Sequence, residues 1–81
     1  MVRVLLFARA SDVVGSSELL WPVDNSGAEA SDFWGWLCER VPGASSLSQV
    51  CRLARNRAYL NAGERIFPGD EIAVIPPVSG G

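Results

Sequence analysis

The spacing of apolar residues changes along this 81-residue chain, and this change restricts the fold more than any other feature of the sequence. Residues 2–8 (VRVLLFA) are apolar and rich in β-branched side chains, which favours a strand. Between residues 29 and 41 the apolar residues fall on one helical stripe, which is typical of an amphipathic helix. The stripe consists of Phe33, Trp34, Leu37, Cys38 and Val41. The chain is therefore expected to combine strands and a helix in an α+β domain.

The two faces of the first strand differ in character. With a period of two, one face carries Val2, Val4 and Leu6 and the other carries Arg3, Leu5 and Phe7. The first set suits a core. On the second face, Leu5 and Phe7 would form an apolar spot beside Arg3, which indicates partial contact with water.

Turn, cap and stop signals divide residues 11–43 into separate elements. Residues 11–17 predict a turn, and residues 18–23 (ELLWPV) predict a second strand near enough to pair with the first as a hairpin. Pro22 puts that strand at an edge or at its own end. The helix is expected to start with Ser31 as its cap and Asp32 near the positive end of the dipole. The dipeptide at residues 42–43 (PG) is a stop signal.

The second half predicts shorter elements. Residues 44–56 are compatible with either a strand or a short helix. Residues 58–61 predict a strand, residues 65–67 a short return strand, and residues 71–75 (EIAVI) the final strand. If the final strand lies beside the first, the two are parallel and joined through the helix by a right-handed crossover.

This order of elements is that of a ubiquitin-like β-grasp domain, a mixed sheet with one main helix packed on one face. The domain is expected to span residues 1–75, followed by a flexible C-terminal tail at residues 76–81 (PPVSGG) that ends in Gly-Gly.

Composition excludes several classes of function. The net charge is −2 and all seven cations are scattered arginines, which argues against nucleic acid. Histidine is missing, and Cys38 and Cys51 are too few for a structural zinc site, so no metal is expected. No apolar run reaches the roughly 20 residues of a membrane span, and no signal-peptide pattern is seen, so a cytoplasmic protein is expected.

The tail offers the chain's best-placed reactive group. Pro76 and Pro77 form a stiff spacer, and Gly80 and Gly81 form a thread thin enough for a narrow pocket in another protein. The carboxyl group of Gly81 would need activation, normally as an acyl adenylate. Because the sequence has no phosphate-binding loop of the GxxxxGK[ST] type, a partner must supply that step with ATP, and no cofactor is expected to bind this chain.

The residues at the end of the chain also carry a family likeness. Residues 69–81 (GDEIAVIPPVSGG) closely resemble the end of the small subunit of molybdopterin synthase. Residues 2–8, followed by Gly15, are similar to that family's opening strand and loop, and residues 59–61 (YLN) fit its strand before the last turn. The resemblance covers the whole chain, with the tail as its most specific part.

This resemblance implies a β-grasp sulfur carrier. It implies that Gly81 is adenylated by an activating enzyme and converted to a thiocarboxylate with sulfur from a donor. Pro76, Pro77, Val78, Ser79 and Gly80 would then enter the active site of the large synthase subunit. There the sulfur would be transferred to cyclic pyranopterin monophosphate for molybdenum cofactor biosynthesis. The resemblance further implies a heterotetramer of two small and two large subunits, with the active site mainly on the large subunit and this chain as its sulfur donor.

The sequence departs from the family pattern at two places. Val74 and Ile75 stand where the family often has aromatic residues, and Ser11-Asp12 stands where it commonly has Arg-Glu. From the strand pattern, Leu5, Phe7 and Ile75 are predicted to form an apolar docking patch for both partners beside the tail. The alternative for Leu5 and Ile75 is a place in the core, under the helix.

Three rival functions stay open at this point. A sulfur carrier of the thiamine type shares the fold and the Gly-Gly end, but such carriers tend to be shorter and to lack the double proline at residues 76–77. A ubiquitin-like protein modifier would attach the tail to lysines of targets, although this chain has no lysine of its own. The third is a binding domain with an inert tail.

Overall fold

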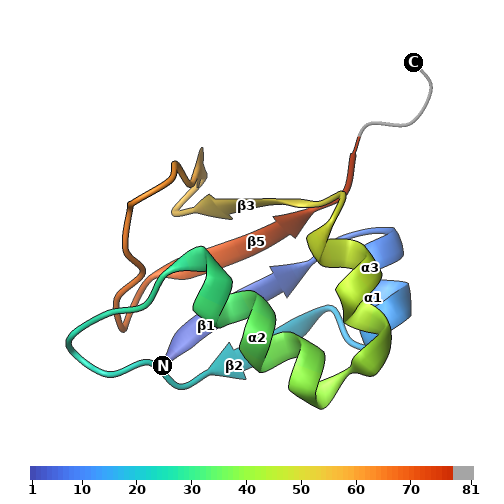
Figure 1. Cartoon of the computed structure of the whole chain (residues 1–81), viewed down its shortest axis with the longest axis horizontal. Helices are drawn as coiled ribbons and strands as arrows, with labels where there is room; N and C mark the ends of the chain where they lie inside the picture. The colour runs from blue at the N-terminus through green and yellow to red at the C-terminus, as the bar shows by residue number, and fades with distance from the viewer. Residues whose placement is uncertain (78–81) are drawn as a thin grey trace.

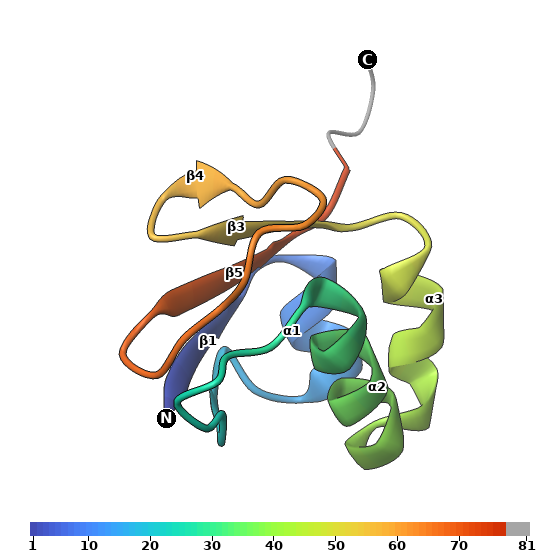
Figure 2. The same cartoon turned by 60° about the vertical axis from the view of Figure 1, so that its left-hand side comes forward.

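The computed structural model describes residues 1–77 of the chain. The elements are β1 (Val2–Leu6), α1 (Arg9–Val14), β2 (Glu18–Trp21), α2 (Ala30–Arg40), the 3-10 turn η1 (Pro42–Ala44), α3 (Ser45–Ser48), β3 (Arg52–Arg55), β4 (Ala58–Tyr59) and β5 (Glu71–Ile75). The strands form one five-stranded sheet in the order β2-β1-β5-β3-β4. The helices lie on one side of this sheet (Figures 1 and 2). This is the predicted α+β architecture.

Strands β1 and β5 are the parallel pair at the centre of the sheet, as predicted, with Val4 opposite Ile72. All other pairings are antiparallel, including the predicted hairpin of β1 and β2. Alternation in both central strands turns every second side chain toward the helices. The buried residues of these two strands are Val2, Val4, Leu6, Ile72 and Val74.

Helix α2 closes the core against that inner face of the sheet. Phe33 and Leu37 are fully buried, and the Phe33 ring meets the Trp21 ring edge-on at 5.3 Å between centroids. Trp36 is half-buried, and its ring lies 6.2 Å from that of Phe33 between centroids. The three remaining members of the predicted stripe, Trp34, Cys38 and Val41, are half-buried and pack around the core.

The start of α2 differs from the prediction. The cap is Glu29, not Ser31. A capping box joins Glu29 to Asp32, whose carboxylate Oδ2 accepts a hydrogen bond from the Glu29 backbone N–H at 2.8 Å. A carboxylate at each end of the box satisfies two free backbone donors, which a single serine at position 31 does not. The stop at Pro42 is confirmed, since α2 ends at Arg40.

The prediction of a turn at residues 11–17 is wrong for residues 11–14, because residues 9–14 form the helix α1. The chain turns sharply at Ala8, which has a φ of 49°, and the Ser11 hydroxyl donates to the Ala8 carbonyl at 2.8 Å. The helix buries Ala10 completely against the core. This burial stabilises a segment whose serine and aspartate favour a turn.

In the second half of the chain, the structure resolves the alternative of a strand or a short helix at residues 44–56 and corrects the predicted pairing of residues 65–67. Residues 44–56 hold both a short helix, α3, and a strand, β3. The predicted return strand at residues 65–67 is reduced to one bridge, in which Ile66 pairs with Ala28. Strand β4 pairs with β3 instead. Ile66 is fully buried, so its packing explains why residue 66 lies beside Ala28.

Candidate partner-docking site

The tail begins where the central strand β5 ends. Ile75 is the last residue of β5, Pro76 is half-buried and Pro77 is exposed. The other predicted tail residues, Val78, Ser79, Gly80 and Gly81, lie outside the described residues. The described chain therefore brings its C-terminal end out of the middle of the sheet, between β1 and β3.

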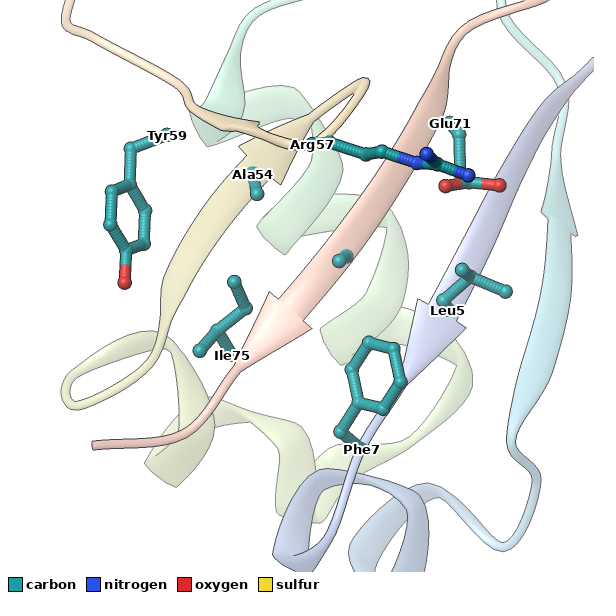
Figure 3. A pocket seen from close by; sticks show the side chains of 8 residues that line it. Leu5, Phe7, Ala54, Arg57, Tyr59, Glu71 and Ile75 are labelled. Carbon is teal, nitrogen blue, oxygen red and sulfur yellow. The ribbon is translucent and has the colours of Figure 1, made fainter. Parts of the chain in front are cut away.

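The three predicted docking residues lie on the outer face of the sheet, opposite the helices. Leu5 and Ile75 are half-buried there, and 51% of Phe7 is exposed. None of the three belongs to the buried core, so the alternative placement under the helix is wrong. Figure 3 shows them along β1 and β5 in one groove. Whether partners bind there stays a prediction.

The groove has a volume of about 560 Å³. Its remaining lining comes from β5 and from the β3–β4 hairpin: Ala54, Arg57, Tyr59, Glu71 and Ala73. The alternation that placed Ile75 outward would also have found Glu71 and Ala73, because all three occupy one face of β5. Tyr59 and Arg57 were missed because the pairing of β4 with β3 was not predicted.

The β3–β4 hairpin turns through two residues that both have positive φ, Asn56 at 50° and Arg57 at 73°. This is the sign pattern of a type I′ turn, which matches the twist of paired strands. Asn56 is held on both sides: its Nδ2 donates to Asp70 at 3.0 Å and its Oδ1 accepts from the Glu71 backbone N–H at 2.9 Å. The Asn56 backbone N–H also donates to the Glu71 carbonyl at 2.8 Å. The turn is therefore fastened to the start of β5.

Two charged residues, Arg57 and Glu71, line the groove, and further charged side chains contact its lining. The Arg3 guanidinium bridges Glu18 at 2.9 Å and Glu71 at 3.3 Å, and the hydrogen bond and charge of Glu18 raise the pKa of Arg3 above its usual value. Arg52 lies over the Tyr59 ring, 3.9 Å from its centroid. The groove thus has an apolar floor with a polar rim, the usual pattern of a protein interface.

A second hollow lies beside the base of the tail, on the α3 side. Its lining residues are Arg9, Ser46, Leu47, Gln49, Val50, Cys51, Pro76 and Pro77. Burial raises the pKa of the Cys51 thiol, which disfavours the reactive thiolate. Within residues 1–77 no cluster of three potential metal ligands occurs, and no helix is long and apolar enough to cross a membrane.

Comparison with known proteins agrees with the fold, and the family match extends to the last residue of the chain. Residues 4–81 match the ThiS family. The molybdopterin synthase sulfur carrier subunit of Aedes aegypti is 37% identical over 86 residues, which cover 99% of this chain and 88% of that protein. The crystal structure of SAMP1 from Haloferax volcanii superimposes with a TM-score of 0.80 and 31% identity, covering 99% of this chain and 98% of that one.

A third match is to a protein–protein complex of subunits 1 and 2 of the molybdopterin-converting factor from Helicobacter pylori. It has a TM-score of 0.71 and 23% identity, covers 99% of this chain and 97% of that one, and supports the fold. The molecule is thus a ubiquitin-like β-grasp domain. It belongs to the ThiS family, with the molybdopterin synthase sulfur carrier subunits among its relatives, and the resemblance noted in the sequence is confirmed.

Proposed function

We propose that this chain is the sulfur carrier subunit of a molybdopterin synthase, and that the carboxyl group of Gly81 carries the sulfur. The observation that carries this proposal is the likeness over nearly the full length to the Aedes aegypti sulfur carrier subunit. The sequence PPVSGG supports it, because it follows the central strand β5 directly.

The chemistry begins with activation by a partner. The Gly81 carboxylate attacks the α-phosphate of ATP held by an activating enzyme, which gives an acyl adenylate and pyrophosphate. Sulfide-level sulfur from a donor then attacks the Gly81 carbonyl carbon and displaces AMP, which leaves a thiocarboxylate on Gly81. In the large subunit this sulfur is transferred to cyclic pyranopterin monophosphate, and water restores the carboxylate. In this scheme the two partners supply the catalytic groups, and this chain acts as the non-catalytic sulfur donor.

The partners follow from this chemistry. We propose a large synthase subunit that receives the tail, in a heterotetramer of two small and two large subunits, and an activating enzyme that binds the same chain at another time. The complex of subunits 1 and 2 in the Helicobacter pylori structure is consistent with such a partner. A cytoplasmic location fits a step that consumes ATP.

The outer groove is the proposed docking surface for both partners. Phe7 is the exposed aromatic side chain nearest the end of β1, and Ile75 directly precedes the tail. An aromatic side chain in a groove can serve as the energetic centre of an interface. Docking at this groove would leave the tail extending from its edge toward the partner's active site.

The second candidate function is protein modification, which the likeness to SAMP1, small archaeal modifier protein 1 of Haloferax volcanii, favours. A modifier would form an isopeptide bond between Gly81 and a lysine of a target. Since this chain has no lysine, it cannot extend side-chain-linked polymers on itself. The double proline at the start of the tail argues against a thiamine-type carrier.

The test is the intact mass of the protein purified from cells that make molybdenum cofactor, with fragmentation to locate any change. A species heavier by the difference between sulfur and oxygen on Gly81 is expected, and a variant without Gly81 should lack it. The proposal fails if the carboxylate is unchanged after incubation with ATP, the activating enzyme and a sulfur donor. Adducts with lysines of other proteins would favour the modifier instead.

A further inference from the structure

Arg57 combines an unfavourable backbone conformation with an exposed charge at the rim of the outer groove. Its φ of 73° is in the left-handed region, where residues other than glycine, asparagine and aspartate rarely lie. Glycine at the second position of a type I′ turn removes that strain, and Asn-Gly is the preferred pair for such turns. Here Asn56 is present and the glycine is not.

The side chain of Arg57 extends across β5 toward Glu71 (Figure 3). Arg57 and Glu71 are the charged residues among those that line the groove. The Glu71 carboxylate already forms an ion pair with Arg3, at 3.3 Å between Oε2 and Nη1. Within residues 1–77 no ion pair within 4.0 Å includes Arg57. The Arg57 guanidinium is therefore available at the groove for a partner's charge.

The hairpin holds this guanidinium in a defined place. The three hydrogen bonds between Asn56 and residues 70–71 fix the turn against β5. Arg52 stacked on Tyr59 further limits the motion of the β4 side of the groove. A charge on a fixed turn loses less conformational freedom on binding than one on a free loop.

We propose that Arg57 is a specificity-determining residue, which pairs with a carboxylate that the large subunit presents beside the apolar group that fills the groove. The proposal rests on the proposed function, since it takes the groove as the docking surface. It gives the reason why a residue with backbone strain occupies the turn: its charge selects the partner.

The experiment measures association of purified large subunit with the wild-type chain and with Arg57→Gly, Arg57→Lys and Arg57→Glu, at low and high salt. Arg57→Gly is the central variant because glycine suits the turn, so its melting temperature should rise while association slows. Charge at an interface rim acts mainly on the association rate and its salt dependence. For Arg57→Glu we expect the association rate at low salt to fall about tenfold. Arg57→Lys should fall between glycine and wild type, because lysine keeps the charge without the planar fork.

The matched control is Arg40→Glu on α2, where Arg40 is exposed on the helix side, 4.9 Å from the Trp36 ring centroid. It makes the same change of charge away from the groove and should leave the association rate unchanged. Equal rates for wild type, Arg57→Gly and Arg57→Glu would overturn the role of Arg57. Failure of the wild-type chain itself to bind the large subunit would instead overturn the proposed function.

Discussion

The inner and outer faces of the sheet are made from the same strands, yet they differ in how deeply their side chains are buried. On the inner face, Val4 and Ile72 are fully buried against α2. On the outer face, the adjacent Leu5 and Ile75 are only half-buried and Phe7 is exposed. A single alternating pattern thus gives one face that is buried in the core and another whose apolar side chains remain accessible. Substitutions on the two faces should separate stability from partner affinity.

Phe33→Ala would test the inner face with the largest expected effect. Removing a fully buried ring that packs on Trp21 should lower the free energy of unfolding by about 3–5 kcal/mol. A domain of this size has a total stability of only about 5–15 kcal/mol, so the variant should be close to unfolding. Urea denaturation followed by circular dichroism measures the loss. A change below about 1 kcal/mol would mean that the inner face is not the main source of stability.

Gly27→Ala would test the rim of the inner face, next to the bridge between Ala28 and Ile66. A Cβ on residue 27 would lie 2.7 Å from Cε1 of Phe67, and its φ is +83°. We expect a loss of about 2 kcal/mol in the free energy of unfolding from backbone strain and this contact together.

The control for Gly27→Ala is Gly63→Ala, where φ is +86° and a Cβ would meet nothing within 4 Å. In Gly63→Ala only backbone strain should lower the free energy of unfolding, by about 1 kcal/mol. The difference between the two variants therefore isolates the contact with Phe67. Equal losses at positions 27 and 63 would show that the Phe67 ring moves aside freely.

Phe7→Ala would test the outer face. We expect affinity for the large subunit to fall about tenfold or more, while the free energy of unfolding changes by less than about 1 kcal/mol. The control is Leu20→Ala on β2, where 58% of the side chain is exposed and the residue does not line the groove. Calorimetric titration and thermal melting measure the two quantities. Unchanged affinity for Phe7→Ala would remove the groove as the docking surface.

Glu64→Gln would test a polar contact outside both faces, and its effect should be the smallest. The Asn61 backbone N–H donates to Glu64 at 2.7 Å and, together with Arg55, lowers the pKa of Glu64. A lowered pKa in the folded state means that this contribution to stability is present above the unfolded value of about 4.3 and is lost as pH falls through the folded pKa.

Thermal melts from neutral to acidic pH should therefore show a shallower loss of stability on acidification for Glu64→Gln than for wild type. The effect should be small because this carboxylate is close to solvent. Glu39→Gln, at an exposed position of α2, makes the same change of charge and is the control. Identical acid profiles for Glu64→Gln and wild type would contradict the coupling.

The sequence predicted those parts in which one period continues over several residues. Alternation was sufficient for β1 and β5, and helical spacing was sufficient for α2. Sequence periodicity did not predict α1. Its six residues include serine and aspartate, which favour a turn, and the burial of Ala10 is known only from the structure. The sequence also failed to predict the β3–β4 pairing, since Asn-Arg is a weak turn signal compared with Asn-Gly.

The candidate site divides in the same way. Leu5, Phe7 and Ile75 follow from strand alternation, so their common face could be predicted. Arg57 and Tyr59 reach the groove only through the turn at residues 56–57 and the pairing of Ala54 with Tyr59. A contact made by a turn with unusual φ values depends on tertiary hydrogen bonds such as those of Asn56, which no local pattern contains.

The central position of β5 has a mechanical consequence. In the proposed cycle the tail enters and leaves a partner's pocket, so a pulling force on the tail would pass from Pro76 into β5. Because β5 is paired with β1 on one side and β3 on the other, force along the strand shears two ladders at once. A tail on an edge strand would load a single ladder. Withdrawal of the tail should therefore leave the domain folded for the next cycle.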